Sequence, residues 1–353
     1  MNHERRDIVN MDEPITVLVA DDSLFMRNLI TNMIDSDPEL KVIDTAKNGE
    51  EALHKISELK PDVVTLDIMM PGWDGLKTLA HIMDTCPVPV IILSAYSREG
   101  ADITMKCLSA GAVGFLLKPS GEISLDIGVL KTQLIDEIKA VSKADVVRVR
   151  SALTKTVKTP RGNVSGNRIV VMGASTGGAP VLKLILSELP ADFTVPIIVV
   201  QHLPNRYFTE SLAEHLDSVS DLNVHVLGNN EKISRGGVHL VPSGFYVSFS
   251  SRSKNEVTGH LTRAEDPLDL SPSVDSTMKS AAKIFKENTI GIVLTGMGKD
   301  GLEGMRAIKK AGGKTFAQDE SSLIFGMPKE VIDAGLADKV LPADMIANAL
   351  TAL

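Results

Sequence analysis

Short apolar runs that alternate with amphipathic segments are the feature that most constrains the fold of this chain. In the first half the runs are ITVLVA, KVIDTA, DVVTLD, PVIILS and VGFLLK. Between the first two, apolar residues from Met26 to Ile34 recur at the spacing of one helix face. Strands that alternate with helices predict a mainly parallel sheet covered by helices on both faces. Residues 14 to about 140 hold five such units, the size of one small doubly wound domain.

Charge divides the chain into three segments. Residues 1–140 carry a net charge of −10, residues 141–167 of +5, and residues 168–353 of −3. The middle segment is rich in Pro, Gly, Ser and Asn near its end and has no sustained period. We therefore predict a domain at 14–140, a linker at 141–167 and a second domain of the same α/β class at 168–353. The basic linker either lies on the acidic first domain or is a solvated tether.

The composition argues against two classes of partner. A net charge of −8 and an aromatic content of 4% disfavour binding to nucleic acid. The charged start, MNHERRDIVNMDEP, has no apolar core of a leader, and no later run is long enough for a membrane span. Cys86 and Cys107 do not have metal-ligand spacing, which fits a reducing compartment. We expect a cytoplasmic protein without membrane insertion.

Polar residues end the predicted strands of the first domain. Asp21 and Asp22 follow the first strand, and Asp67 ends the third. Because parallel strands share one carboxyl edge, these carboxylates should converge, and Mg²⁺ is the cation that suits them. Ser94 ends the fourth strand and Lys118 the fifth. Each residue alone also fits a helix cap or an exposed position, but the set predicts a site for an acyl phosphate.

The first half resembles the response-regulator receiver domain, which has a flavodoxin-like fold. The resemblance is carried by VADDSLFMR, TLDIMMPGWDG, ILSAY and GAVGFLLKP. It implies that Asp21, Asp22 and Asp67 bind Mg²⁺ and that Asp67 is also the phosphoacceptor. It further implies that Ser94 is the switch hydroxyl, that Phe115 is the aromatic residue whose rotamer reports the phosphorylation state, and that Lys118 contacts the phosphoryl group.

The glycine-rich stretch VVMGASTGGAP, residues 170–180, has two opposed interpretations. A dinucleotide fingerprint requires a second glycine where Ser175 stands, and the following strand ends in Gln201 rather than an acid. A phosphate loop would require a lysine after the glycines, and none follows. Gly173 to Gly177 fit G-x-S-x-G, a turn that presents a serine hydroxyl at the edge of a sheet. The serine interpretation is therefore favoured.

A serine nucleophile needs a base and an acid at the same edge. His202 directly follows a strongly apolar strand, whereas the other histidines after Ser175 fall inside elements where surface or core roles are expected. Asp300 follows another apolar strand, although it equally fits a cap of the helix beginning near Gly301. The chemistry predicted is acyl transfer to water, with Ser175 as nucleophile, His202 as base and then acid, and Asp300 as its orienting group.

Two further features complete the predicted hydrolase site. Backbone N–H groups near Thr176 and Met297 are the candidates for an oxyanion hole. The chain order Ser, His, Asp differs from the order Ser, Asp, His of α/β-hydrolases, so an α/β serine hydrolase of another type is expected.

The second half resembles the catalytic domain of the chemotaxis protein-glutamate methylesterase family, CheB. The motifs are GASTGG, VVQHLP, SPSVD and VLTGMGKDG, spread over residues 168–353. The resemblance places Ser175, His202 and Asp300 at the family's triad positions and implies hydrolysis of glutamate γ-methyl esters on methyl-accepting chemoreceptors, with no cofactor in that site. It also implies deamidation of receptor glutamines. Substrate contacts are expected in SPSVD, although its start also fits a helix beginning at Pro272: Ser271, Pro272, Ser273, Val274 and Asp275.

The family further implies a regulatory arrangement. The unphosphorylated receiver would cover the hydrolase site, and phosphorylation of Asp67 by the chemotaxis histidine kinase would relieve the block. Two other classes stay open: a receiver-regulated interaction protein with an inactive hydrolase-like domain, and a nucleotide-binding oxidoreductase, which Ser175 and Gln201 already disfavour.

Overall fold

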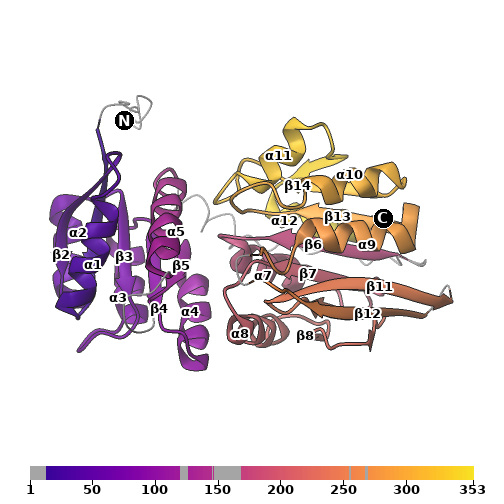
Figure 1. The fold of residues 1–353 in the computed structure, drawn as a ribbon, viewed down its shortest axis with the longest axis horizontal. Helices are drawn as coiled ribbons and strands as arrows, with labels where there is room; N and C mark the ends of the chain where they lie inside the picture. The colour runs from indigo at the N-terminus through magenta and orange to yellow at the C-terminus, as the bar shows by residue number, and fades with distance from the viewer. Residues whose placement is uncertain (1–12, 120–125, 145, 147–167, 254–255, 267–268) are drawn as a thin grey trace.

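The computed structural model describes residues 13–119, 126–144, 146, 168–253, 256–266 and 269–353. Its strands form two parallel sheets and one small antiparallel sheet, with the two parallel sheets in separate halves of the chain (Figure 1). Of the predicted linker, only residues 141–144 and 146 are described, and the remainder lies outside the described residues. The three-part division at 141 and 167 therefore stays a prediction.

The first sheet has five parallel strands in the order β2-β1-β3-β4-β5, the flavodoxin-like order. β3 and β4 are buried along their whole length, as expected for the central strands of a sheet covered on both faces. Helices α1 and α5 contact each other, and α2, α3 and α4 pack in succession, so the helices form two layers. The strands are β1 (Ile15–Ala20), β2 (Leu40–Ala46), β3 (Val63–Asp67), β4 (Val90–Ser94) and β5 (Gly114–Leu117). The helices are α1 (Leu24–Ile34), α2 (Gly49–Leu59), α3 (Gly75–Thr85), α4 (Arg98–Ala110) and α5 (Asp126–Val141).

The second sheet has seven parallel strands in the order β15-β14-β13-β6-β7-β10-β8. The strand order reverses at β6, and such a switch point is where parallel sheets bind ligands. Helix α7 contacts α8 and α12, while α10 contacts α9 and α11, which again gives two layers. The strands are β6 (Ile169–Ala174), β7 (Ile197–Gln201), β8 (Val224–Val226), β10 (Val238–Leu240), β13 (Thr289–Val293), β14 (Lys314–Gln318) and β15 (Lys339–Leu341). The helices are α7 (Gly178–Glu188), α8 (Arg206–Asp217), α9 (Val274–Phe285), α10 (Leu302–Lys310), α11 (Met327–Asp333) and α12 (Ala343–Thr351), with a 3₁₀ turn η1 (Lys286–Asn288).

A three-stranded antiparallel sheet, which the sequence did not predict, is attached to the second half. Its order is β11-β12-β9, from β9 (Glu231–Lys232), β11 (Phe245–Ser253) and β12 (Glu256–Arg263). Strand β11 packs against helix α9. His260, one of the histidines after Ser175, lies in β12.

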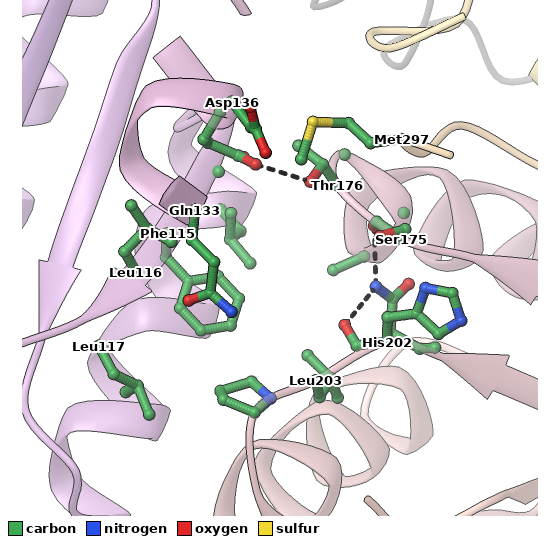
Figure 2. Close-up of a pocket in the computed structure, with 18 of the residues that line it drawn as sticks. Phe115, Leu116, Leu117, Gln133, Asp136, Ser175, Thr176, His202, Leu203 and Met297 are labelled. Carbon is green, nitrogen blue, oxygen red and sulfur yellow. Dashed lines mark hydrogen bonds between the residues drawn. The ribbon is translucent and has the colours of Figure 1, made fainter. Parts of the chain in front are cut away.

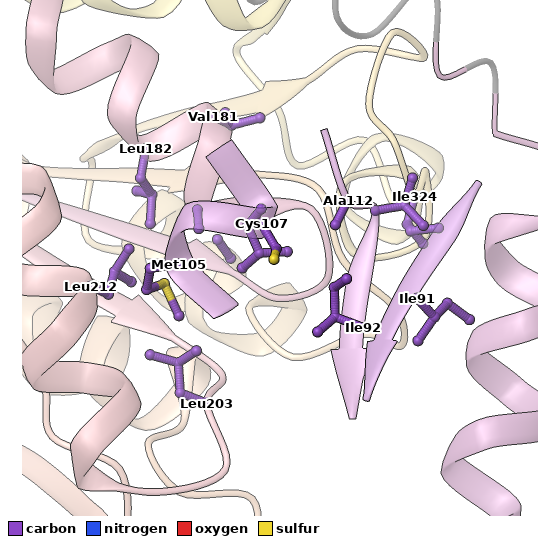
Figure 3. Packing of buried hydrophobic residues seen from close by; sticks show 14 of the residues in the cluster. Ile91, Ile92, Met105, Cys107, Ala112, Val181, Leu182, Leu203, Leu212 and Ile324 are labelled. Atoms are coloured by element: carbon purple, nitrogen blue, oxygen red, sulfur yellow. The ribbon is translucent and has the colours of Figure 1, made fainter. Parts of the chain in front are cut away.

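The two halves meet where α4 packs against α7 and α8. Figure 3 shows Met105 of α4 on the side of Leu182 of α7 and Leu212 of α8, whereas Cys107 lies on the other side of α4, toward Ala112 and Ile92. All of these side chains belong to one continuous apolar cluster. Polar contacts surround this cluster. Arg98 donates hydrogen bonds to Glu210 Oε2 at 2.9 Å and to Glu214 Oε1 at 2.6 Å. The ring of Tyr96 contacts that of Tyr207 edge to face. Ser109 Oγ lies 2.8 Å from His215 Nε2.

Candidate active site

Ser175 lies in a sharp turn between strand β6 and helix α7. Gly177, at the start of the helix, has φ +77, a conformation that side chains rarely adopt. The backbone of Ser175 is held on both sides, because its N–H donates to Thr295 O at 3.0 Å and its carbonyl accepts from Gln201 Nε2 at 2.8 Å. The second of these bonds is visible in Figure 2. The turn therefore presents the serine at the carboxyl edge of the sheet.

A close backbone approach fixes the loop that follows β13. A Cβ added to Gly296 would lie 2.6 Å from the Ser175 Cβ and 2.6 Å from Met327 Sδ. Only glycine fits there without displacing the serine. The loop that carries Met297 and Asp300 is therefore held against Ser175.

His202 and Asp300 are within hydrogen-bond distance of each other at the same sheet edge. His202 follows β7, and its Nε2 lies 2.9 Å from Asp300 Oδ2, with 14% and 8% of the two side chains exposed. Burial alone would raise the pKa of Asp300, but the hydrogen bonds from His202 and from two backbone N–H groups outweigh it and lower that pKa. An ionised carboxylate at this position favours an imidazole that becomes charged.

Asp300 does not cap the helix that follows it, which was the second interpretation of this residue. Its carboxylate accepts from the N–H groups of Val274, at 2.7 Å, and Asp275, at 2.9 Å, at the start of α9. In exchange, Asp275 Oδ1 accepts from the N–H groups of Gly301, at 2.9 Å, and Gly304, at 2.6 Å, at the start of α10. The two aspartates thus cap each other's helices and lock the position of the Asp300 carboxylate.

The SPSVD segment lies beside Asp300. Ser273 caps α9 and donates from Oγ to Asp300 Oδ1 at 3.2 Å. Helix α9 begins at Val274, so the expectation of a helix start at Pro272 is wrong, because the cap is Ser273. Ser271 Oγ donates to Asp269 O. The contacts in this segment position Asp300, and a role in binding substrate stays a prediction.

Ser175 and His202 line a cavity of about 370 Å³ shared by the two halves of the chain. Met297 and Thr176 line the same cavity (Figure 2). Within the described part of the chain, the N–H groups of Thr176 and Met297 donate to no other residue, so both remain available to an oxyanion. On the opposite wall, Phe115 and Glu137 come from β5 and α5.

Glu137 reaches across the cavity from the receiver half. Its Oε2 accepts from Thr176 Oγ1 at 3.1 Å, the bond drawn at Thr176 in Figure 2. Glu137 as a whole is 4% exposed, and burial raises the pKa of its carboxyl to about 7, an effect that the Thr176 bond only partly offsets. A carboxyl of the first half therefore contacts the residue next to Ser175.

The predicted acidic residues of the first half also converge. One carboxylate oxygen from each of Asp21, Asp22 and Asp67 lies within 4.8 Å of the others. Lys118 Nζ lies 2.7 Å from Asp21 Oδ2 and 2.8 Å from Asp67 Oδ1. Burial raises the pKa of Asp67, and the contact with Lys118 offsets only part of this increase. Burial alone would lower the pKa of Lys118, but the carboxylates of Asp21 and Asp67 raise it above its ordinary value.

Ser94 lies next to Lys118, whose N–H donates to the Ser94 carbonyl at 2.8 Å, and the Ser94 and Phe115 side chains have contacts of their own. The Ser94 hydroxyl is fully buried, donates to Gly100 O at 3.2 Å and accepts from Thr104 Oγ1 at 2.9 Å. Phe115 stacks on Phe208 of α8, with ring centroids 4.7 Å apart and planes at 7°. The residue predicted to report the phosphorylation state is thus part of the contact between the two halves.

Comparisons with known proteins identify both halves of the chain. Residues 17–127 match the response regulator receiver domain, and residues 170–350 match the CheB methylesterase family. A protein-glutamate methylesterase/protein-glutamine glutaminase of Thermotoga maritima is 43% identical, over 97% of this chain and 99% of its own length. One of Symbiobacterium thermophilum is 39% identical, over 97% of each chain.

The chain belongs to the CheB methylesterase family. It is a methylesterase that carries a response regulator receiver domain, as the resemblance predicted. The crystal structure of the Thermotoga maritima CheB methylesterase catalytic domain superposes on it with a TM-score of 0.51 and 43% identity, covering 54% of this chain and 99% of that one. The parallel-sheet α/β fold expected for both halves is confirmed, by this structure for the second half and by the receiver-domain match and the strand order for the first. No helix in the described ranges of this CheB protein is long and apolar enough to cross a membrane.

Two residues at this CheB site were not singled out from the sequence. Gln201 served only to disfavour dinucleotide binding, yet its amide holds the carbonyls of Ser175 and His202. Its position at the end of β7 was a usable signal. Glu137 had no usable signal, because a glutamate in an amphipathic helix is ordinarily exposed and its burial depends on the second half packing over it.

Proposed function

We propose that this chain hydrolyses glutamate γ-methyl esters through Ser175, His202 and Asp300. Ser175 Oγ bonds to the ester carbonyl carbon while His202 takes its proton, and the N–H groups near Thr176 and Met297 stabilise the oxyanion. Because Asp300 engages Nε2 of His202, Nδ1 is the nitrogen that receives the proton. That proton then leaves with methoxide as methanol, and a water molecule activated by His202 releases the glutamate.

The observation that carries this proposal is that Ser175, His202 and Asp300 follow three different strands and lie at one edge of the sheet. Ser175 and His202 share one cavity, and Asp300 is locked against His202 at 2.9 Å. Similar relatives are named protein-glutamate methylesterase/protein-glutamine glutaminase, which supports glutamyl esters and glutamine side chains as substrates. With glutamine, the same steps release ammonia. Methyl-accepting chemoreceptors are the protein substrates that we propose.

We also propose that the receiver half blocks this site until Asp67 is phosphorylated by a histidine kinase. The cavity at Ser175 is walled by β5 and α5, and Glu137 contacts Thr176 directly. Phosphoryl bonds to Ser94 and Lys118 would move β4 and β5, and with them Phe115, which stacks on Phe208. Breaking this stack would shift the population toward an undocked, open enzyme.

The acidic residues of the receiver fit a Mg²⁺ ion. Three carboxylates whose oxygens lie within 4.8 Å of one another carry more negative charge than the single ammonium of Lys118 neutralises. Asp22 is exposed, which leaves room for water ligands. Asp21, Asp22 and Asp67 would hold the ion, which would neutralise phosphoryl charge at Asp67.

Phosphorylation should raise activity by about tenfold, within the usual range of coupling between two sites. Methanol release from methylated receptor is measured with and without Mg²⁺ and a small phosphodonor. Asp67→Asn should keep the unstimulated rate and lose the increase, while Asp84→Asn, an exposed aspartate of the same half, should retain it. An Asp67→Asn protein that is still activated would contradict the proposed switch. An absence of methanol release from wild type under either condition would favour an interaction protein instead.

Glu137 should make the block depend on pH. Its pKa in the docked state is about 7 against an ordinary value of 4.5, so the docked state binds the additional proton between these pH values. Docking is therefore strongest below about pH 4.5 and weakens as pH rises through 7. Glu137→Gln keeps the oxygen that accepts from Thr176 without the charge. Wild type without phosphodonor should become about tenfold faster than this variant by pH 8.

The control for this comparison is Asp136→Asn, which removes an exposed charge at the same cavity. It should follow the wild-type pH profile. Because both proteins share Ser175 and His202, titration of the catalytic residues cancels in the ratio of rates. A ratio of wild type to Glu137→Gln that stays constant from pH 5 to 8 would show that Glu137 does not set the docking equilibrium.

A further inference from the structure

Two histidines and one glutamate meet where the seven-stranded sheet adjoins the three-stranded sheet. His225 of β8 and His239 of β10 are register partners on neighbouring parallel strands, so their side chains emerge on the same face. Glu231 of β9 belongs to the antiparallel sheet, where it pairs with Gly259. These three residues, the His225 cluster, lie outside the cavity at Ser175 and are not used by the proposed hydrolysis.

The donor atoms of the His225 cluster converge on one point. His225 Nε2 lies 2.6 Å and His239 Nδ1 3.2 Å from the same oxygen, Glu231 Oε1. One ligand atom from each of the three residues lies within 4.8 Å of the others. His239 is fully buried, whereas 36% of the His225 side chain and 28% of the Glu231 side chain are exposed. The cluster is therefore closed on one side and open to solvent on the other.

Each side chain of the cluster is held by a second contact at its far end. His225 Nδ1 lies 3.0 Å from Asn223 Oδ1, and His239 Nε2 lies 3.4 Å from Ser234 Oγ. Glu231 Oε2 accepts from the Gly228 N–H at 2.6 Å. Outer contacts of this kind fix the tautomer and the direction of metal-binding imidazoles and carboxylates. Three ligands with three outer partners form a preorganised set.

We propose that His225, Glu231 and His239 bind a divalent transition metal ion, with Zn²⁺ as the best match. Two imidazole nitrogens and one carboxylate oxygen are a donor set that Zn²⁺ takes, whereas Mg²⁺ and Ca²⁺ prefer oxygen alone. Solvent on the open side supplies a fourth ligand. The proposal is independent of the proposed hydrolysis, since it uses none of its residues.

Binding requires shifts of less than an ångström between Glu231 and the two imidazoles, and it sets the distance between the imidazole nitrogens, which lie within 4.8 Å of each other. A tetrahedral Zn²⁺ with bonds of about 2.0–2.1 Å keeps its ligand atoms roughly 3.3 Å apart. The contact of His239 with Glu231 is already 3.2 Å, and the partly exposed ring of His225 needs to withdraw by a fraction of an ångström. With the ion on His225 Nε2 and His239 Nδ1, the other ring nitrogens face Asn223 Oδ1 and Ser234 Oγ, which can accept their N–H groups.

The ion would join two sheets that otherwise meet through side chains. His225 lies on β8, the edge strand of the seven-stranded sheet, and Glu231 lies on the edge strand of the antiparallel sheet. A ligand that binds only the folded protein raises its melting temperature. Zn²⁺ should therefore stabilise the full chain at concentrations above its Kd.

Zn²⁺ uptake by the full-length protein tests the proposal. Metal content and melting temperature are measured with limiting Zn²⁺ in excess Mg²⁺, which occupies the receiver carboxylates, and Co²⁺ is used as a visible-absorption probe of tetrahedral coordination. Wild type should bind one equivalent and give the intense tetrahedral Co²⁺ spectrum. His225→Ala should weaken Zn²⁺ binding by about a hundredfold or more, because even outer partners contribute tenfold to a hundredfold. Glu231→Gln is a second variant of similar shape that should also lose the ion.

Two histidine variants separate the alternatives. His260→Ala changes a histidine of the antiparallel sheet that contacts Ser250 and Asn230, and it should bind Zn²⁺ as wild type does. His202→Ala should also retain binding. Failure of wild type to take up Zn²⁺, uptake that survives both His225→Ala and Glu231→Gln, or uptake lost in His202→Ala would each overturn the proposal.

Discussion

Ser175→Ala should lower methanol release from methylated receptor by about four orders of magnitude or more, to the residual rate of a site that retains only binding and oxyanion contacts. The reason is that the alanine has no oxygen to bond to the ester carbonyl, while the turn itself is held by the backbone bonds of residue 175 to Thr295 and Gln201. The variant should fold normally. The melting temperature of the variant, with and without phosphodonor, is measured together with its rate of methanol release.

A matched serine variant separates chemistry from folding. Ser187→Ala removes an exposed hydroxyl from the end of α7, the helix that begins just after Ser175. It should keep the wild-type rate. If Ser175→Ala retained more than about a tenth of that rate while Ser187→Ala behaved as wild type, Ser175 would not be the nucleophile and another residue of the cavity would have to supply it.

Asp300→Asn should lower the rate by roughly three to four orders of magnitude, because an amide no longer holds His202 in the tautomer that accepts the serine proton. Among the described residues, the carboxylate of Asp300 accepts hydrogen bonds from His202, Ser273 and the N–H groups of Val274 and Asp275. An amide nitrogen in place of either oxygen would face at least one N–H or O–H donor. The kcat for methanol release and the melting temperature are the quantities to measure.

The loss of unfolding free energy expected for Asp300→Asn, compared with its loss of rate, distinguishes Asp300 from an ordinary helix cap. Losing an acceptor for buried donors costs about 1–3 kcal/mol of unfolding free energy, a modest decrease in melting temperature beside a large loss of rate. Asp192→Asn, an exposed aspartate, should change neither quantity. A decrease in melting temperature with a rate within tenfold of wild type would assign Asp300 to helix capping alone.

The strands whose carboxyl ends carry the two sites were predictable, because each is a short apolar run that is followed by or ends at a polar residue. Central parallel strands are buried on both faces, so β3, β4, β6 and β7 are written in the sequence as continuous apolar runs. The antiparallel sheet was missed for the same reason. Strand β11, FYVSFSSRS, mixes aromatic residues with serines and has no continuous apolar run.

The position of Asp300 shows where local sequence stops being sufficient. A loop aspartate before a helix fits both a cap and an orienting acid, and the choice depends on α9, which lies 25 residues earlier in the chain and meets the loop only in the folded structure. The exchange of caps between Asp300 and Asp275 is a contact between two helix starts. No pattern within either helix contains that information.

The sequence by itself determined the family, the fold class of both halves and the residues that lie at the carboxyl edges of their sheets, because strand direction and polar strand ends are local properties. The tertiary structure alone decided three things: that Glu137 and Phe115 line the cavity at Ser175, that Asp275 positions Asp300, and that the His225 cluster assembles. Each of these depends on residues far apart in the chain. They are brought together by burial of apolar surface between whole elements, which places polar side chains that no local pattern could pair.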